Sequence, residues 1–244
     1  MPPQMIFIQK FQRCAKEFVN KLKSIKSKVE NIRSIPVSDL LHPKKLKVLK
    51  LAGANTLMPA SRLSRIWELA KGCCDLEGSF VECGTYKGGS AAMLIANAGS
   101  RDVWLFDSWE GCPEPSEDDV DRGGNKGQRG DFMSSLESFE LMLGRLPSYK
   151  CKLHIVKGWF KDTVPSSKDE IGKIALLHLD GDWYESTKVC LEQLYDAIVP
   201  GGILIIDDYG YWKGCKKAVD EFLEGRSTHL VQQDDSQALV FINI

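Results

Sequence analysis

Four short apolar runs that each end on a carboxylate constrain the fold of this 244-residue chain more than any other feature. They are FVE, WLFD, LLHLD and LIID, and they end at Glu82, Asp107, Asp180 and Asp207. Segments of helical periodicity separate the runs, and this alternation predicts a parallel sheet with helices on both faces. Open α/β sheets bind ligands at the edge where the carboxyl ends of their strands meet. The sequence therefore predicts a Rossmann-like, mostly parallel, doubly wound α/β fold with four acids at its ligand crevice.

The spacing of the apolar residues predicts where the individual elements lie. Strands are expected at Ser79–Cys83, Asp102–Asp107, Leu153–Val156, Ile174–Asp180, Gly202–Asp207 and Leu239–Ile242. Helices are expected at Arg62–Lys71, Gly89–Ala98, Glu137–Leu146, Tyr184–Ile198 and Lys216–Leu223.

We divide the chain into a basic N-terminal arm, residues 1–50, and one α/β domain, residues 51–244. The arm has twelve Lys and Arg against three Asp and Glu, a net charge of +9, whereas the remainder carries −10. Helically spaced apolar residues predict a basic amphipathic helix at 11–32. We expect this helix to pack on its own domain or in a homo-oligomer, and contact with an anionic membrane is less favoured. The acidic domain argues against nucleic acid as a partner.

The cysteines and the apolar segments bear on the compartment. Eight cysteines are scattered without a C-x-x-C or a Cys/His cluster, which indicates reduced thiols rather than disulfides or a zinc site. No apolar stretch approaches the ~20 residues that span a bilayer. The first residues, MPPQMIFIQKF, lack the features of a signal peptide. We therefore expect a cytoplasmic location.

The segment VECGTYKGGS, residues 81–90, has the pattern of a strand, a glycine-rich turn and the start of a helix. Glycines let the backbone approach a ligand closely, but the dinucleotide pattern G-x-G-x-x-G is absent. The carboxylate of Glu82 favours a ligand with an amino group, and S-adenosylmethionine fits that description. Asp107 ends the next strand, where acids bind ribose hydroxyls in nucleotide-binding folds; a helix N-cap is the alternative.

Residues after the strand ends supply candidate contacts for the rest of a nucleoside. Ser108 and Trp109 follow Asp107 and are expected along the ribose and adenine. Gly158 and Trp159 follow the next strand, and the indole is interpreted either as an aromatic wall for the purine or as a core residue.

A group of acids, Asp180, Asp182, Asp207 and Asp208, follows two strands. Oxygen ligands suit a hard cation such as Mg²⁺, which takes one or two carboxylates together with waters and substrate oxygens. Two adjacent carboxylates repel each other unless a cation, a cationic group or solvent relieves the repulsion. No cysteine or second histidine accompanies the group, which argues against zinc. His178, expected on the same strand face as Asp180, is interpreted as a core residue.

Five segments together resemble the macrocin O-methyltransferase family of S-adenosylmethionine-dependent enzymes. They are VECGTYKGGSA, LFDSWEG, VKGWFKDTVP, LHLDGDWYESTKVCLEQLY and VPGGILIIDDYGYWKGCKKAVDEF. The upstream TLMPASRL resembles the segment that covers the cofactor in that family. The resemblance, from about residue 55 to 225, implies a class I methyltransferase fold for the domain. It also implies methylation of a hydroxyl on a small molecule, a sugar or sugar-bearing natural product, assisted by a divalent metal such as Mg²⁺.

The resemblance further implies roles for individual residues. Contacts to the cofactor are implied for Thr56, Leu57, Glu82, Gly84, Thr85, Tyr86, Lys87, Asp107, Ser108, Trp109, Gly158 and Trp159. Metal ligands are implied at Asp180, Asp207 and Asp208. Asp180 is also the expected general base, with Asp182 and then His178 as weaker candidates.

Residues 112–131 are polar and glycine-rich, and we expect them to form a substrate lid that decides which acceptor is bound. Three other functions stay open as alternatives. A nucleotide-sugar glycosyltransferase would use the D-x-D at 180–182, but the glycine turn with Glu82 argues against it. A nicotinamide-dependent enzyme lacks its glycine spacing, and a non-catalytic nucleoside-binding module has little need of paired acids.

Overall fold

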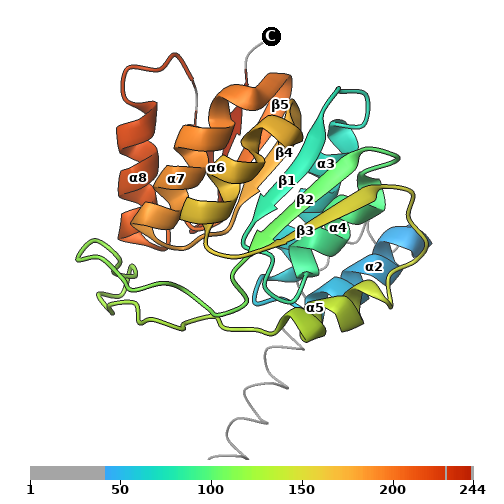
Figure 1. The fold of residues 1–244 in the computed structure, drawn as a ribbon, viewed down its shortest axis with the longest axis horizontal. Helices are drawn as coiled ribbons and strands as arrows, with labels where there is room; N and C mark the ends of the chain where they lie inside the picture. The colour runs from blue at the N-terminus through green and yellow to red at the C-terminus, as the bar shows by residue number, and fades with distance from the viewer. Residues whose placement is uncertain (1–41, 229, 243–244) are drawn as a thin grey trace, which may run out of the picture.

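A seven-stranded sheet forms the centre of the computed structural model, which describes residues 42–228 and 230–242 (Figure 1). The strands lie in the order β3-β2-β1-β4-β5-β7-β6, and only the β5–β7 and β6–β7 pairs are antiparallel. They are β1 (Ser79–Cys83), β2 (Asp102–Asp107), β3 (Lys152–Lys157), β4 (Ile174–Leu179), β5 (Ile198–Ile206), β6 (Leu230–Gln232) and β7 (Ala238–Phe241). The mostly parallel sheet predicted from the sequence is confirmed.

Helices cover both faces of the sheet, as the alternation of segments predicts. They are α2 (Pro43–Gly53), α3 (Ala60–Gly72), α4 (Gly89–Asn97), α5 (Leu136–Leu143), α6 (Phe160–Ile171), α7 (Tyr184–Leu194) and α8 (Lys213–Leu223), with a 3₁₀ turn η2 (Tyr195–Ala197). The first three pack together on one face, and α6, α7 and α8 on the other (Figure 1). Each face buries its own hydrophobic cluster, one around Leu63 and Leu105 and the other around Leu177 and Leu191.

Helices α6 and α7 are among the elements that differ from the sequence prediction, and the reason is physical in both cases. Helix α6 is not expected because its segment has few apolar residues, of which Val164 and Ile171 are buried, and contains Pro165. The helix expected at Tyr184–Ile198 is shorter, because Ile198 already belongs to β5 and pairs with β4. Tertiary pairing therefore overrides the helical pattern at this end.

Helix α2 runs across the boundary expected between residues 50 and 51. Pro43 lies at its start, where a missing N–H is not needed. The helix buries Val48, Leu49 and Ala52 and packs on α3 and α4. Residues 43–53 are thus part of the compact domain. The amphipathic helix expected at residues 11–32 lies outside the described residues.

The strand order fixes where a ligand crevice lies. From β1 the chain moves outward to β2 and β3, then crosses to β4 and β5 on the other side of β1. Ligands bind open α/β sheets at this reversal point, outside the carboxyl ends of the strands. Glu82 on β1 and His178 on β4 are register partners beside it. The ends of β2, β4 and β5 carry the other predicted acids, Asp107, Asp180 and Asp207.

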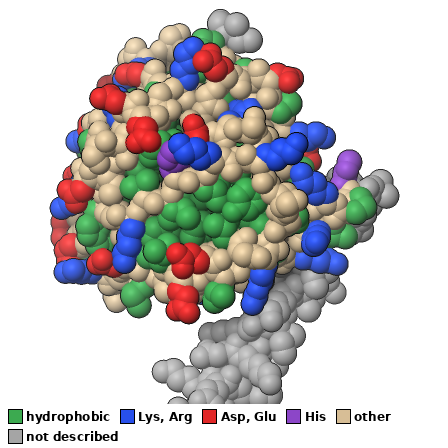
Figure 2. All heavy atoms as spheres, turned by 45° about the vertical axis from the view of Figure 1, so that its right-hand side comes forward, with side chains coloured by type: hydrophobic (Ala, Val, Ile, Leu, Met, Phe, Trp, Pro, Cys, Tyr) green, Lys and Arg blue, Asp and Glu red, His purple; other side chains and the backbone are tan. Residues whose placement is uncertain are grey.

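The cysteines and the surface can be compared with the sequence. The seven cysteines within the described ranges are free thiols, and six of them are buried. None of the helices that the structure describes is long and apolar enough to cross a membrane. Figure 2 brings the right-hand side of Figure 1 forward and shows hydrophobic side chains gathered in the middle of that face, with charged side chains around them. The outer strand β3 itself exposes Ile155, a residue that is 40% accessible.

Candidate active site

A pocket of about 430 Å³ opens at the carboxyl ends of β1, β2, β4 and β5. This volume is within the range of sites that hold small molecules and cofactors. Its wall combines five parts of the chain: residues 55–59 before α3, the glycine turn after β1, the strand ends, residues 111–132, and residues after β5 and β6. The pocket thus lies at the reversal point that the topology defines.

The glycine turn approaches the end of β4 so closely that a side chain would not fit. Gly84 has a φ of +103°, and a Cβ built on it would lie 1.8 Å from the carbonyl oxygen of Asp180. Gly89 opens α4 against the segment before α3, where a Cβ would lie 2.5 Å from Thr56 Cβ. The absence of both side chains leaves the backbone as the wall of the pocket.

Asp107 is held by the backbone of two turns. Its Oδ2 accepts the N–H of Tyr86 and its Oδ1 accepts the N–H of Trp109, each at 2.6 Å. Burial raises the pKa of Asp107, and these N–H groups act in the opposite direction. The alternative role as a helix N-cap is wrong, because the next helix, α5, begins at Leu136 and is capped by Ser135.

Glu82 is fully buried and does not belong to the wall of the pocket. Its Oε1 lies 3.0 Å from Nδ1 of His178, and both side chains are fully buried. Neither Glu82 Oε2 nor His178 Nε2 has a hydrogen-bond partner among the described residues. His178 is therefore a core residue, as expected, but it is one that pairs with an acid.

Nine of the twelve residues expected to contact the cofactor line the pocket. They are Thr56, Leu57, Gly84, Thr85, Tyr86, Asp107, Ser108, Gly158 and Trp159. The other three, Glu82, Lys87 and Trp109, are not part of its wall. Trp109 is buried behind it, where its Nε1 donates to the carbonyl oxygen of Tyr86 at 3.0 Å.

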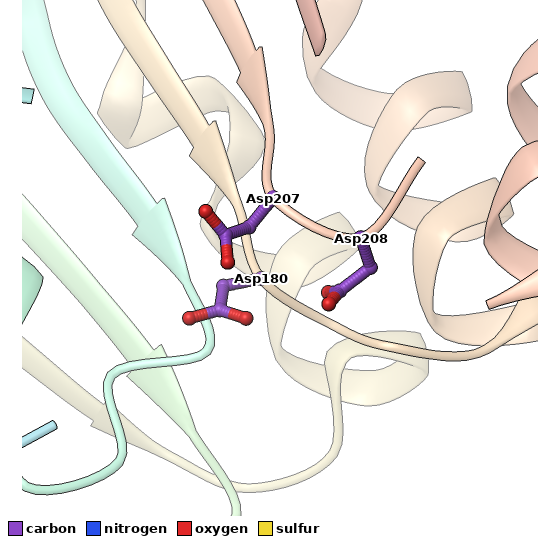
Figure 3. A group of neighbouring side chains, drawn as sticks. All are labelled: Asp180, Asp207 and Asp208. Atoms are coloured by element: carbon purple, nitrogen blue, oxygen red, sulfur yellow. The ribbon is translucent and has the colours of Figure 1, made fainter. Parts of the chain in front are cut away.

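The three predicted metal ligands come together at the ends of β4 and β5 (Figure 3). One carboxylate oxygen from each of Asp180, Asp207 and Asp208 lies within 4.8 Å of the other two. Burial, followed by the charges of the neighbouring acids, raises the pKa of Asp180 and Asp208 well above the ordinary value. Arg62 lies against the cluster and contacts Asp207 Oδ2 at 2.7 Å. A cationic group thus relieves part of the repulsion that the sequence predicts.

Asp182 lies beside the cluster in a left-handed conformation, with a φ of +57°. Its Oδ1 accepts the indole N–H of Trp212 at 2.9 Å, and its Oδ2 lies 3.6 Å from the thiol of Cys112. Burial raises its pKa to about 7, against the effect of these two donors. Its own N–H donates to Asp208 Oδ2 at 3.2 Å.

Residues 112–131 form a folded wall beside the cluster. Val120 pairs with Lys126, and Asp121 pairs with Trp212 just before α8. Asp119 Oδ1 accepts the N–H of Tyr184 at the start of α7, at 2.7 Å. These contacts fasten the segment to the helices on that face. The segment contributes Cys112, Pro113, Arg122 and Asp131 to the pocket.

Several residues of the pocket were not singled out by sequence reasoning. The pocket is also lined by Arg62, Cys112, Phe132, Tyr211 and Trp212, none of which was given a role of its own. Arg62, Tyr211 and Trp212 lie within segments that carry the family resemblance, and Cys112 lies in the 112–131 segment. Tyr211 and Trp212 follow the adjacent acids of β5 directly, and this proximity was the available signal.

Backbone strain gathers at the same place. Among residues 42–228 and 230–242, four residues other than glycine have a positive φ: Tyr86, Trp109, Phe132 and Asp182. Three of them line the pocket and the fourth is packed behind it. Such conformations persist where the surroundings enforce them, and they concentrate at functional sites.

The fold and the pocket together define a class I methyltransferase. The solved structure of the O-methyltransferase NovP superposes with a TM-score of 0.67 and 29% identity, covering 78% of this chain and 83% of that one. The calicheamicin methyltransferase CalS11 shares the fold, with a TM-score of 0.64, 22% identity and coverage of 85% and 86%. The fold class expected from the sequence is confirmed.

The family is shown by the sequence itself. Residues 50–240 match the family described as macrocin-O-methyltransferase (TylF). The chain belongs to this family, and the resemblance on which the prediction depended is confirmed. The family gives no support to the glycosyltransferase, nicotinamide and binding-module alternatives.

Curated relatives carry related names. Demethyldecarbamoylnovobiocin O-methyltransferase of Streptomyces niveus is 32% identical over 70% of this chain and 68% of its own length. Mycinamicin III 3''-O-methyltransferase of Micromonospora griseorubida is 30% identical over 74% and 76%. A tetracenomycin-C 4'-O-methyltransferase of Streptomyces olivaceus, which acts on a dimethoxyrhamnosyl derivative, is 37% identical over 59% of this chain. The match spans 58% of the length of that relative.

Proposed function

We propose that this chain transfers the methyl group of S-adenosylmethionine to a hydroxyl of a sugar or a sugar-bearing natural product, with the help of a divalent metal such as Mg²⁺. The observation that carries the proposal is that one pocket joins the glycine turn and Asp107 to the acid cluster of β4 and β5. A methyl donor and a chelated acceptor would thus meet in one space.

The cofactor half of the pocket fits an adenosyl group. Gly84 and Gly89 leave room where a Cβ would fill the space, and Asp107 keeps lone pairs beside its two N–H donors for ribose hydroxyls. Thr56 and Leu57 would cover the methionine end, and Trp159 would border the adenine. The nine residues on the wall are the proposed contacts. Glu82, Lys87 and Trp109 would support this wall from behind rather than touch the cofactor.

The acid cluster fits a hard divalent cation. Its three ligands are carboxylates with oxygens close enough to share one ion. Asp180 receives no hydrogen bond from the described residues, so its lone pairs are available. When bound, the ion would polarise neighbouring substrate oxygens and lower the pKa of the hydroxyl that reacts.

The acceptor is proposed from the names of the relatives and from the shape of the wall. The name of the Streptomyces olivaceus relative includes a rhamnosyl group, and all three relatives are named as O-methyltransferases. An aromatic group beside the acids consists of Phe132, Tyr211 and Trp212. The ring centroids of Phe132 and Trp212 are 6.4 Å apart, and the two rings are arranged edge to face. Aromatic faces suit the apolar C–H surface of a sugar ring. Residues 112–131 close the same side and are proposed to select the acceptor.

Methyl transfer is an in-line displacement, so the chain mainly has to align the acceptor oxygen, take its proton and exclude water. Asp180 was expected as both a metal ligand and the base. A bound cation would favour the ionised form of the Asp180 carboxylate and so make it a weaker base, which favours a division of the two roles between residues. Asp182 lines the same pocket outside the three-acid cluster and is oriented by Trp212. We therefore assign Asp180 to the metal and Asp182 to the proton, with Asp180 as the competing candidate for the base.

The first test is calorimetric titration of S-adenosylmethionine and S-adenosylhomocysteine, with NAD⁺ and UDP-glucose as controls, each with and without Mg²⁺. Binding of the adenosyl compounds alone supports the proposal. No binding of either compound would overturn it, and a UDP-glucose signal that requires Mg²⁺ would restore the glycosyltransferase alternative.

The acceptor is then sought by incubating the protein with S-adenosylmethionine, Mg²⁺ and a panel of glycosides and nucleotide sugars. Methylated product is identified by mass spectrometry. Turnover that is unaffected by a chelator would contradict the metal-assisted part of the proposal. A cytoplasmic location and association into a homo-oligomer remain our expectations for the chain.

A further inference from the structure

Arg62 stands between the acid cluster and a second group of charges. It lies in the first turn of α3, lines the pocket and has a side chain only 12% exposed. Its guanidinium contacts Asp207 Oδ2 at 2.7 Å and Asp234 Oδ1 at 3.4 Å. Within the described ranges, the ion pair with Arg62 is the only one that the carboxylates of the cluster make.

The three carboxylates of the cluster are held to very different degrees. Asp207 is anchored on both side-chain oxygens, by Arg62 on Oδ2 and by Gln237 Nε2 on Oδ1 at 2.8 Å. Its main-chain oxygen also accepts the hydroxyl of Ser236 at 2.6 Å. The side-chain carboxylate of Asp208 accepts one backbone N–H, and that of Asp180 accepts no hydrogen bond from the described residues. Asp207 is therefore the carboxylate of the cluster whose orientation is most firmly held.

The charge of Arg62 is strongly supported by its surroundings. A guanidinium keeps its charge in proteins, and here it lies within ion-pair distance of both Asp207 and Asp234. The acid cluster therefore has a fixed cationic neighbour.

We propose that Arg62 is a positioning residue of the divalent-metal site, which holds the Asp207 carboxylate in one orientation and compensates the charge of the cluster. The proposal rests on the metal-assisted function proposed above. Each carboxylate oxygen has two lone pairs, so an oxygen that accepts one N–H can still bind a metal. Groups that hydrogen-bond a metal ligand contribute about 10- to 100-fold to metal affinity.

The position of Arg62 in the chain adds a structural consequence. Residues 55–59, which line the cofactor half, lead directly into α3, and the N–H of Arg62 donates to the carbonyl oxygen of Pro59 at 3.0 Å. One helix start therefore carries both the cover of the cofactor half and the anchor of a metal ligand.

The test measures binding of Mn²⁺ to the full chain in the presence of S-adenosylhomocysteine, by calorimetry and by electron paramagnetic resonance. Arg62→Met is expected to weaken binding about 10-fold or more. Arg65→Met is the matched control, because Arg65 lies on the same helix and contacts Asp234 and Gln237 but not Asp207. It should keep Mn²⁺ affinity within about 3-fold of the unchanged protein, below the range expected for a ligand's hydrogen-bond partner.

Arg62→Lys guards against a fold defect, since Arg62 is nearly buried. Lysine keeps the positive charge but lacks the forked guanidinium donor. We therefore expect the Mn²⁺ affinity of Arg62→Lys to lie between that of the unchanged protein and that of Arg62→Met. Circular dichroism and the affinity for S-adenosylhomocysteine report whether each variant is folded. Mn²⁺ binding by Arg62→Met or by Arg62→Lys that equals or exceeds that of the unchanged protein would overturn the role of Arg62. A wild-type chain that binds no Mn²⁺ would instead overturn the metal site itself, and the role of Arg62 with it.

Discussion

The two halves of the pocket, at the ends of β1 and β2 and at the ends of β4 and β5, are lined by different kinds of groups. At the ends of β1 and β2 the wall is backbone, with Gly84 in a left-handed conformation and Asp107 held by the N–H groups of Tyr86 and Trp109. At the ends of β4 and β5 the wall is charged side chains, with three carboxylates in mutual contact range and Arg62 against them.

This difference predicts how each half fails. A backbone wall is fixed by close approach, so added volume should damage it, whereas a group of charges is fixed by its electrostatic balance. A substitution that keeps the shape but removes a charge should therefore affect the β4–β5 half most. The predictions below separate the two halves by these two kinds of change.

Adding one methyl group at Gly84 should have the largest effect. In Gly84→Ala the new Cβ would meet the carbonyl oxygen of Asp180 at 1.8 Å, and the positive φ adds a cost of its own. Overpacking and strain together are worth about 2–5 kcal/mol, so S-adenosylhomocysteine affinity should fall about 30- to 1,000-fold. Gly99→Ala is the control, because Gly99 also has a positive φ but nothing within 4 Å of its Cβ. Equal binding by the two variants would refute a steric origin.

Removing a charge at Asp180 without changing its shape should affect the other half. Asp180→Asn is expected to reduce turnover and Mn²⁺ binding more than about 100-fold, because even an indirect partner of a metal ligand is worth 10- to 100-fold. Affinity for S-adenosylhomocysteine, measured by calorimetry, should stay nearly unchanged. Asp169→Asn, on the exposed surface of α6, controls for the loss of one negative charge. Near-normal turnover by Asp180→Asn would remove Asp180 as a metal ligand and also as the competing candidate for the base.

The parts of the molecule that could be predicted from the sequence depend on local patterns. The bounds of β1 and β2 agree with the expected strands, because a short, continuous apolar run with an acid at or next to its end is visible in a few consecutive residues. The cluster of Asp180, Asp207 and Asp208 follows from the strand ends and the parallel topology.

The parts that could not be predicted depend on contacts between distant residues. Arg62 and Asp207 are 145 positions apart, and no spacing rule links them. Glu82 was expected at the cofactor, but its side chain turns toward His178 on β4, and sequence cannot show which partner a strand-end acid will take. Helix α6 was missed because its segment has few apolar residues and contains Pro165, which disfavours a helix in the sequence pattern. Burial of Val164 and Ile171 against the rest of the fold stabilises the helix nevertheless.

Asp107 sharpens the comparison because it is an acid within the backbone half. In Asp107→Asn the amide keeps the shape but presents an N–H₂ group to one of the two N–H donors from Tyr86 and Trp109. A charged hydrogen bond of this kind is worth about 1.5–3 kcal/mol, so affinity for S-adenosylhomocysteine should fall about 10- to 100-fold. Mn²⁺ affinity should not change. A loss of Mn²⁺ binding as large as that of the cofactor would mean that the two halves are one coupled unit.

The smallest expected effect concerns Asp234, which lies behind the charged half and contacts Arg65 at 2.8 Å as well as Arg62. Burial alone would raise the pKa of Asp234, but the hydrogen bond from Arg65 and the N–H groups of Gln237 and Ser236 lower it to about 2. The folded pKa is below the ordinary value of about 3.9, so the carboxylate stabilises the fold above that pH. This contribution is lost as the pH falls through about 2. Because the group is partly exposed, we expect about 1 kcal/mol, or a Tm decrease of roughly 2–4 °C for Asp234→Asn at neutral pH.

The pH dependence of the Tm difference between the unchanged protein and Asp234→Asn shows whether Asp234 stabilises the fold through its charge or through its hydrogen bonds. If the charge matters, the Tm values of the unchanged protein and of Asp234→Asn should converge between pH ~5 and ~2, because protonation removes the same charge from the unchanged protein. The measurement is thermal unfolding followed by circular dichroism at a series of pH values. A difference that stays constant down to pH ~2 would mean that Asp234 acts through the shape and hydrogen bonds of its turn. The support behind Arg62 would then be of the same kind as the backbone wall around Gly84, and the division of the pocket into two kinds of construction would not extend beyond the cluster itself.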